Sequence, residues 1–317
     1  MNESRSSSEG AAEGQSDGLT WVAFFLIALF AGGNPVAVQF SNSGLPPFWG
    51  ATLRFAGTAL IFWLLVLARG IALPRGRALL GTVVYGLLSV GGAYAGLYWG
   101  LLRAPAGLVG ALLALMPLLT LFFAWAHGVE RLRLRGLVGA LIATGGVLLG
   151  VIGGFSGSVP LLSVLALVAG VASLAEASVV FKLFPHGHPI ATNAVALTAG
   201  GPPLIALSLL TGEQWSVPGG FSTWAAYLYL VLVGSVGVFS LYLRVLSTWT
   251  ASATSYVFLL MPVATVVIAA VVAGEVITLS FVIGTALVLA GVWIGAIRKA
   301  PEAAELVCSE MPSKALC

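Results

Sequence analysis

Two stretches of this sequence share one pattern: ALLALMPLLTLFFAWAHGVE at 111–130 and VFLLMPVATVVIAAVVAGE at 257–275. In each, a Met-Pro pair opens a long apolar run, a Thr follows three residues after the proline, and a Glu closes the run thirteen residues after it. Pro117 and Pro262 are 145 positions apart. Proline inside a helix removes a backbone hydrogen bond at a cost of ~3 kcal/mol, so its recurrence in the same setting indicates a repeated structural unit.

The composition is that of a membrane protein. Of the 317 residues, 59% are hydrophobic and 8% are charged, whereas a soluble domain carries about 25% charged residues. The net charge of +3 is spread without the basic patch and interleaved aromatics of a nucleic-acid-binding protein. Both cysteines, Cys308 and Cys317, lie in the polar C-terminal tail. We therefore predict an integral membrane protein with no disulfide framework, no metal site, no cofactor and no nucleic-acid partner.

Ten segments are long and apolar enough to cross a bilayer, which takes about 20 apolar residues in a helix. Residues 1–18 are predicted to form a disordered lead and residues 298–317 a polar tail. The predicted spans are 19–41, 46–68, 78–102, 106–126, 135–153, 160–182, 189–210, 223–245, 250–272 and 279–297.

The basic residues of the connections predict the orientation, because cytoplasmic loops are enriched in Lys and Arg. One side of the predicted bundle carries Arg69, Arg75, Arg77, Arg131, Arg133, Arg135, Lys182, Arg244, Arg298 and Lys299. The other side carries Arg103 alone. We therefore predict that both termini are cytoplasmic.

The repeat extends beyond the two Met-Pro stretches. Residues 104–151 align with 249–296 without a gap, and the identical positions include proline, threonine, glutamate and two glycines. Each half then contains five spans, and an odd number requires the second half to enter the membrane from the opposite side. We predict an all-α integral membrane fold in which two inverted five-helix repeats, 19–153 and 160–297, surround a central cavity.

Four motifs of the first half resemble a known family: GGNPVAVQF (32–40), LPPFWGATLRF (45–55), LLRAPAGLVGALLALMPLLTLFFAWAHGVE (101–130) and RGLVGALIATGGVLLG (135–150). They are similar to the EamA repeat of the drug/metabolite transporter superfamily, and the second half repeats the pattern more weakly. Ten-helix members of this superfamily include bacterial inner-membrane exporters of amino acids, among them the YddG-type exporters of aromatic amino acids. The resemblance implies export of small metabolites from a bacterial cell.

Ionisable side chains inside a span are costly and are therefore candidates for a functional site. Arg54 and Glu176 lie clearly within predicted spans. Two interpretations of Arg54 stay open: binding of a substrate carboxylate, and donation to carbonyls exposed at helix ends. Glu176 is interpreted either as a protonatable carboxylate facing the cavity or as an interfacial residue paired with Lys182 or a backbone group.

Uncharged polar side chains complete the predicted cavity. Asn34 lies in a Gly-Gly-Asn-Pro run that frees backbone carbonyls within a span, so it is expected to line the cavity, with a simple kink as the alternative. The other candidates, at similar depth in the third, eighth and ninth spans, are Tyr94, Tyr98, Ser235, Ser240, Tyr242 and Tyr256.

Prolines and glycines have predicted mechanical roles. Pro117 and Pro262 are predicted to be paired hinges for two gates, or to set helix curvature only. The fifth and tenth spans carry small residues four apart, a spacing that lets helices approach closely. These residues, expected to pack the two helices at the periphery or to form an oligomer contact, are Gly146, Gly150, Gly291 and Gly295. Whether the protein is a monomer or a homodimer stays open.

These features favour a secondary transporter that exports small metabolites by alternating access, with amino acids, aromatic ones included, as the leading class. A proton-coupled exporter of cationic drugs that uses Glu176 is the alternative. A channel would carry rings of like charge along a pore, and a membrane enzyme would need paired acid/base groups or metal ligands at one depth. The sequence has neither pattern, so we expect no catalysis, and we expect substrate and lipid as the partners.

Overall fold

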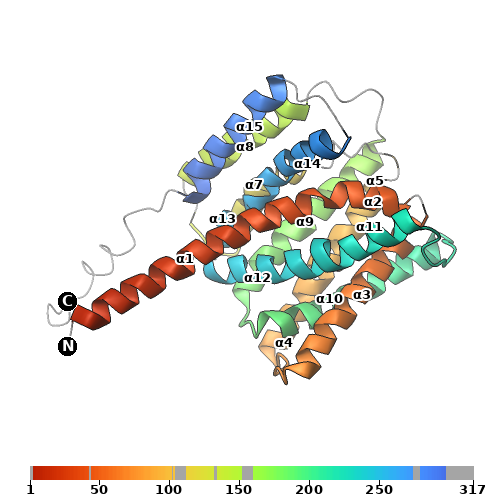
Figure 1. The fold of residues 1–317 in the computed structure, drawn as a ribbon, viewed down its shortest axis with the longest axis horizontal. Helices are drawn as coiled ribbons and strands as arrows, with labels where there is room; N and C mark the ends of the chain where they lie inside the picture. Colours follow the sequence, from red (N-terminus) through yellow and green to blue (C-terminus); the bar gives the residue numbers. More distant parts are fainter. Residues whose placement is uncertain are drawn as a thin grey trace.

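The computed structural model describes residues 3–42, 44–101, 103, 112–131, 134–151, 160–273 and 279–297 (Figure 1). Within these ranges every regular element is a helix and none is a β-strand, which confirms the all-α prediction. The connection between the two predicted repeats and the tail 298–317 lie outside the described residues.

The helices of the first half include one π-helical segment, η1, in the third span. They are α1 (Glu3–Gly32), α2 (Asn34–Asn42), α3 (Pro47–Ala68), α4 (Arg77–Gly86), η1 (Leu87–Gly92), α5 (Ala93–Leu101), α7 (Met116–Ala126) and α8 (Leu134–Val151). The helices of the second half are α9 (Leu161–Leu183), α10 (Pro189–Leu210), α11 (Phe221–Val231), η2 (Leu232–Gly237), α12 (Val238–Thr248), α13 (Ala251–Ser255), α14 (Val257–Ala273), α15 (Leu279–Val292) and η3 (Trp293–Ile297).

The predicted disordered lead differs from the structure, in which α1 begins at Glu3. This stretch contains no proline, and adding residues to an existing helix costs far less than starting a new one. The first span and its polar lead therefore form one continuous helix up to Gly32.

Five helices in the described ranges are long and apolar enough to cross a membrane. They are Pro47–Ala68, Arg77–Gly100, Leu161–Leu183, Pro189–Leu210 and Phe221–Thr248. Five shorter apolar helices fall within the remaining predicted spans: Gly18–Gly32, Met116–Ala126, Leu134–Leu149, Ala251–Ala264 and Val282–Gly295.

Helices of the first half pack chiefly against helices of the second half. α1 lies against α12 and α14, α3 against α10, α5 against α9, and α8 against α15 (Figure 1). The α8–α15 pair lies at one edge of the bundle, away from α3, α4 and α10. The two halves therefore form one interleaved bundle, and the space between them is enclosed by both.

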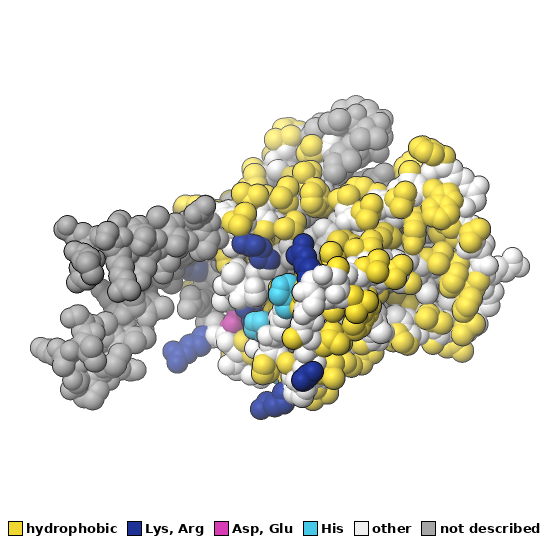
Figure 2. All heavy atoms as spheres, turned by 60° about the horizontal axis from the view of Figure 1, so that its bottom comes forward, with side chains coloured by type: hydrophobic (Ala, Val, Ile, Leu, Met, Phe, Trp, Pro, Cys, Tyr) yellow, Lys and Arg dark blue, Asp and Glu magenta, His cyan; other side chains and the backbone are white. Residues whose placement is uncertain are grey.

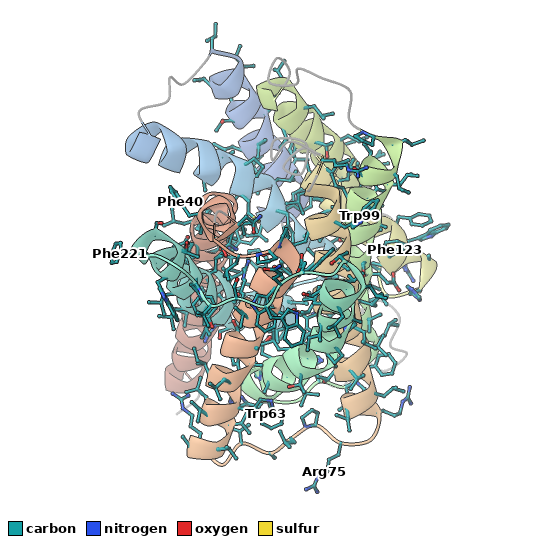
Figure 3. All side chains as sticks on the ribbon, turned by 90° about the vertical axis from the view of Figure 1, so that its right-hand side faces the viewer. Phe40, Trp63, Arg75, Trp99, Phe123 and Phe221 are labelled. Carbon is teal, nitrogen blue, oxygen red and sulfur yellow. The ribbon has the colours of Figure 1, made fainter. Side chains whose placement is uncertain are left out.

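The surface divides by polarity. Figure 2 shows Lys, Arg and His side chains gathered at one end of the molecule, while hydrophobic side chains cover much of the remaining visible face. Arg75 lies at that end in the connection between α3 and α4, and Phe40 and Phe221 are exposed on the flank (Figure 3). An apolar flank with a basic end is the surface expected of a protein embedded in lipid.

The two prolines of the repeat occupy different positions in their helices. Pro117 lies in the first turn of α7, where the missing N–H would have no helical partner in any case, whereas Pro262 lies inside α14. A turn at residues 114–115 precedes α7, and α14 follows a break at Tyr256. The local backbone around the two prolines is therefore not the same, and their role as paired hinges stays a prediction.

The π-helical segments η1 and η2 are equivalent where the prolines are not, and a third described π-helical segment is η3. η1 runs from Leu87 to Gly92 and η2 from Leu232 to Gly237, so each end of η2 follows the matching end of η1 by 145 positions. This is the separation of the two Met-Pro pairs. A π-helical turn holds one extra residue and is rare in helices, where it often marks a functional site.

The glycines of α8 and α15 face each other within one chain. A methyl group added at Gly146 would come within 2.6 Å of the Gly284 carbonyl oxygen, and one added at Gly291 within 2.5 Å of the Gly139 carbonyl oxygen. Gly295 lies against the ring of Tyr256. The surroundings of Gly150 lie outside the described side chains. The open sides of Gly146 and Gly291 are thus covered by the same chain and are not free for an oligomer contact.

Adjacent glycines of α8 provide a matched stability test. We expect Gly146→Ala to lower the Tm by several degrees, because overpacking a tight contact costs about 1–3 kcal/mol. Gly145 has no atom within 4 Å of an added methyl group, so Gly145→Ala should hold or raise the Tm. Thermal unfolding of the two purified variants in detergent is the measurement, and equal Tm values would contradict the close α8–α15 packing.

Candidate functional site

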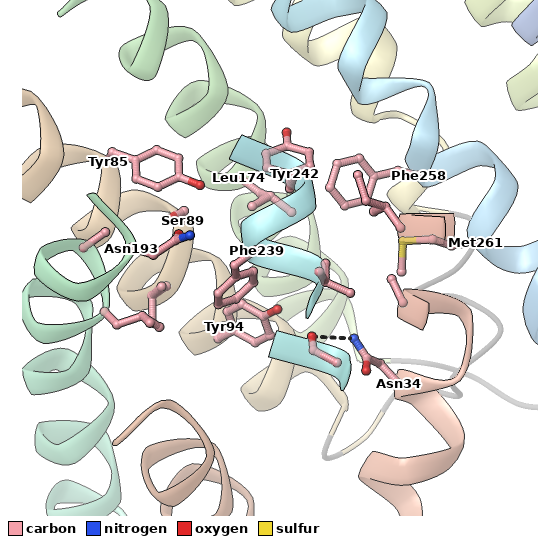
Figure 4. A pocket seen from close by; sticks show the side chains of 17 residues that line it. Asn34, Tyr85, Ser89, Tyr94, Leu174, Asn193, Phe239, Tyr242, Phe258 and Met261 are labelled. Atoms are coloured by element: carbon pink, nitrogen blue, oxygen red, sulfur yellow. Dashed lines mark hydrogen bonds between the residues drawn. The ribbon is translucent and has the colours of Figure 1, made fainter. Parts of the chain in front are cut away.

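A cavity of about 80 Å³ lies in the interior between the two halves (Figure 4). It is lined by residues of α1, α2, α4, η1 and α5 from the first half and of α9, α10, η2, α12 and α14 from the second half. This volume holds a few water molecules. A ligand the size of an amino acid therefore requires the lining helices to move apart.

The cavity wall is aromatic and uncharged. Five aromatic side chains line it: Tyr85, Tyr94, Phe239, Tyr242 and Phe258. The polar side chains among them, apart from the tyrosine hydroxyls, are Asn34, Ser89 and Asn193. The described lining residues include no Asp, Glu, Lys, Arg or His. The cavity can thus offer ring faces, hydroxyls and amides to a ligand, and no fixed charge.

Tyr242 is held by a hydrogen bond between helices. Its hydroxyl lies 2.7 Å from the Ser178 hydroxyl of α9, and its ring meets Phe258 edge-on with 5.9 Å between centroids. Tyr85, on the same side of the cavity as Tyr242 in Figure 4, meets Phe181 of α9 in the same way at 5.6 Å. Aromatic side chains from four helices therefore pack around one side of the cavity.

Arg54 is buried beside the cavity but outside its lining. Its Nε donates to the Ser235 hydroxyl at 2.8 Å, and its Nη2 donates to the Gly234 carbonyl at 2.9 Å. The guanidinium also lies 5.6 Å from the centroid of the Tyr94 ring, a cation–π contact. No ion pair between Arg54 and a carboxylate occurs among the described residues. These contacts match the interpretation of Arg54 as a donor to an exposed carbonyl.

One carbonyl of η1 and one of η2 accept hydrogen bonds from other helices. The Gly234 carbonyl of η2 accepts from Asn34 Nδ2 at 3.3 Å as well as from Arg54. The Leu88 carbonyl of η1 accepts from the Ser173 hydroxyl of α9 at 2.9 Å. In both cases the donor belongs to the opposite half of the chain. Both π segments line the cavity and are tied across the boundary between the halves.

A comparison of the sequence with known protein families identifies the kind of protein that contains this cavity. The EamA-like transporter family matches residues 18–152 and again 161–296, which together cover most of the chain. The chain belongs to the EamA-like transporter family. It is therefore a membrane transporter of the drug/metabolite transporter superfamily, in contact with lipid and a small-molecule substrate, and not an enzyme.

Relatives of this EamA-like transporter agree with that assignment. The uncharacterized inner membrane transporter YedA of Escherichia coli strain K12 is 27% identical over 256 residues, which are 80% of this chain and 82% of the relative. The protein of the same name from Escherichia coli O157:H7 gives the same values. A crystal structure with 22% sequence identity covers 88% of this chain and 97% of its own, with a TM-score of 0.75. That likeness shows a common fold.

Glu176 of the transporter lies outside the described cavity lining and contacts His127. Its Oε1 lies 2.7 Å from His127 Nε2, and the two side chains are 22% and 42% exposed. The predicted partner Lys182 does not take part in this pair. The predicted pairing with Lys182 is corrected, because the partner His127 is 49 positions away in sequence and is brought close by the packing of α7 on α9, and the proton-carrier interpretation stays a hypothesis.

Three of the nine predicted cavity residues line the cavity of this EamA-like transporter: Asn34, Tyr94 and Tyr242. Ser235 bonds Arg54, and Tyr256 donates its hydroxyl to the Gly136 carbonyl at 2.6 Å, which ties the start of α14 to α8. The remaining candidates outside the lining are Tyr98, which is buried against Tyr94, and Ser240. Depth along a span was predicted from the sequence, but the direction of each side chain around the helix was not.

Sequence reasoning missed several lining residues, and one of them had a usable signal. Asn193 is an amide in the second turn of an apolar helix, so the cost of burying a polar group already marked it as a candidate. Tyr85, Phe239 and Phe258 gave no such signal, because aromatic residues in a span are as often lipid-facing or core residues.

Substitutions of Arg54 distinguish a role that depends on the geometry of its hydrogen bonds from a role that depends only on its charge. We expect Arg54→Lys and Arg54→Gln both to lower the Tm in detergent, because neither side chain reproduces two donors at a fixed angle and each such bond is worth about 1.5–3 kcal/mol. Exposed Arg244 is the control, and Arg244→Gln should leave the Tm unchanged. Wild-type Tm values in both variants, with transport kept by Arg54→Lys and lost by Arg54→Gln, would instead assign Arg54 to charge recognition.

Proposed function

We propose that this EamA-like transporter is a secondary transporter of a bacterial inner membrane that exports small metabolites of no net charge, amino acids first, by alternating access. The observation that carries the proposal is the aromatic and uncharged cavity between the two halves. The inner-membrane location follows YedA, and the direction of transport follows the family resemblance.

The proposed topology has ten spans and two inverted repeats. This count is supported by the two copies of the family domain, since each copy contains five of the long or shorter apolar helices named above. An odd number per copy reverses the second copy in the membrane. The basic end of the molecule in Figure 2 is then the cytoplasmic end, with both termini on that side. A cavity between inverted repeats is the usual place for the substrate of such transporters.

The cavity wall favours a substrate without net charge. A net charge would enter a site whose described lining offers no opposite charge, and an unpaired charge in an apolar interior is strongly unfavourable. The two charges of a zwitterion partly compensate each other, and hydroxyls and amides can bind both. The five lining rings also provide faces for an aromatic side chain and for an ammonium group.

The alternative, a proton-coupled exporter of cationic drugs, gains no support from the position of Glu176. The carboxylate contacts His127 and does not face the described cavity. Another carboxylate of the region, Glu130, accepts a hydrogen bond from the Ser252 backbone N–H at 3.2 Å and lies at the start of α13. Neither is placed to bind a cation in the cavity.

Paired π segments are the proposed moving parts, in place of the paired prolines. Each holds one residue more than an α-helical turn, each lines the cavity, and each is tied to the opposite half through a carbonyl. Converting a π turn to α-helix rotates one end of the span relative to the other. Alternate conversion of the two segments would open the cavity to each side in turn.

Transport by purified protein tests the proposed function. We expect proteoliposomes containing the wild-type protein to exchange labelled phenylalanine for internal phenylalanine, with weak competition from lipophilic cations. Glu176→Gln should keep this exchange and its pH dependence, because Glu176 lies outside the cavity lining. Exchange of lipophilic cations without exchange of any amino acid would overturn the substrate class, and loss of pH dependence in Glu176→Gln would restore the proton-carrier hypothesis.

Deletion of one residue tests the role of η2. Removing Leu232, which is exposed, lets η2 close to a regular α-helix, so we expect a folded protein whose exchange rate falls at least tenfold. Deletion of exposed Leu165 in α9, a span without a π segment, turns the rest of that helix by about 100° and should abolish folding. The measurements are Tm and exchange rate, with Leu232→Ala as a side-chain control.

Wild-type exchange by the Leu232 deletion would contradict a moving role for η2.

A further inference from the structure

Two amide groups of the cavity wall have atoms without hydrogen-bond partners. Asn193 is 2% exposed, and its Nδ2 has no partner among the described residues. Asn34 Oδ1 is buried and also has no partner there. Buried polar atoms are nearly always paired in folded proteins, so each exception requires an explanation.

The two amides belong to opposite halves of the chain and face the same space. Asn193 lies on α10 and Asn34 at the start of α2 (Figure 4). In the figure they lie on opposite sides of the cavity, with Tyr94 and Phe239 between them. The unpaired atom of Asn193 is a donor, and that of Asn34 is an acceptor. A ligand in the cavity would meet the Asn193 donor, whereas Asn34 Oδ1 lies against Gly234.

The orientation of Asn34 is set by its surroundings. Its Nδ2 donates to the Gly234 carbonyl, and its Oδ1 lies against Gly234 without a hydrogen-bond partner among the described residues. Gly234 has no side chain at the place where Asn34 Oδ1 lies, and a methyl group there would collide with it. The absence of a side chain at 234 therefore makes room for the Asn34 amide in this position.

We propose that Asn193 binds the head group of a zwitterionic α-amino acid through its carboxylate. The Asn193 amide N–H donates to the substrate carboxylate, and Asn34 Oδ1, which lies against Gly234, takes no part in this contact. This assignment rests on the proposed function and names a contact that carries its specificity. The rings of Tyr94, Phe239 and Phe258 are then left for the substrate side chain.

A structural role and a ligand-binding role for Asn193 predict opposite changes of the Tm when Asn193 is replaced. An amide that bonds the protein stabilises the fold, and its removal lowers the Tm. A buried amide N–H that bonds only a ligand is unpaired in the ligand-free protein and lowers its stability. Replacing the amide with an apolar side chain of similar size should therefore hold or raise the Tm. Stability and transport therefore separate the two roles of this residue.

The experiment uses full-length wild type, Asn193→Leu and Thr192→Val in proteoliposomes. Thr192 is the matched control, because it is buried on the same helix, also has an unpaired hydroxyl and is not among the lining residues. Exchange of labelled phenylalanine is measured with three competitors: phenylalanine, 3-phenylpropionate, which lacks the ammonium, and phenethylamine, which lacks the carboxylate. The Tm of each protein is measured in detergent.

We expect Asn193→Leu to lose at least tenfold in phenylalanine exchange with an unchanged or higher Tm. Competition by phenylalanine and 3-phenylpropionate should weaken in this variant, and competition by phenethylamine should not. Thr192→Val should exchange phenylalanine like the wild type. Wild-type exchange by Asn193→Leu, an equal loss for all three competitors, or a Tm lowered by several degrees would each overturn the assignment of Asn193.

Failure of the proposed function is distinguishable in the same experiment. A wild-type protein that exchanges no amino acid would overturn both the proposed function and the head-group assignment. A wild type that exchanges phenylalanine beside an Asn193→Leu variant that does so equally well would overturn the assignment alone.

Discussion

Hydrocarbon cannot hydrogen-bond to a backbone carbonyl, and the breaks in the helices of this transporter are arranged around that constraint. The Phe30 carbonyl beside the break at Gly33 accepts from the Tyr229 hydroxyl, and the Ala114 carbonyl at the turn before α7 accepts from the Thr144 hydroxyl. η1 and η2 receive donors from α9, and from α2 and α3. These four irregular turns are thus covered by side chains from other helices, which tie the helices of the bundle to one another.

The same irregular turns shape the proposed site. Because the donors come from the opposite half at both π segments, the cavity wall is built from short polar groups that tie the halves together and from rings that fill the space between them. Arg54 belongs to this arrangement, since its guanidinium donates hydrogen bonds to η2. What is left for a ligand is a neutral, aromatic space with the unpaired amide nitrogen of Asn193.

The fold was largely predictable and the site only partly. Apolar length and the 145-residue repeat marked the helices, and the same cost of burying polar groups marked Asn34 and Arg54. The pairing of His127 with Glu176 was not predictable, since it depends on which faces of α7 and α9 meet. The π segments LLSVGG and LVGSVG carry no special residue that predicts an extra residue in the turn.

Sequence alone determined that this chain lies in a membrane, that its helices repeat in two halves, and that it resembles a family of metabolite transporters. These properties follow from the free-energy cost of placing each residue type in hydrocarbon. That cost can be read from the residues of one span without knowing how the spans pack. Only the tertiary structure decided which polar residues bond the backbone of another helix and which line the cavity. Arg54 and Tyr256 are of the first kind, and Asn193 is of the second. That division depends on the rotation of each helix about its axis, and the rotation is set by contacts between residues far apart in the sequence.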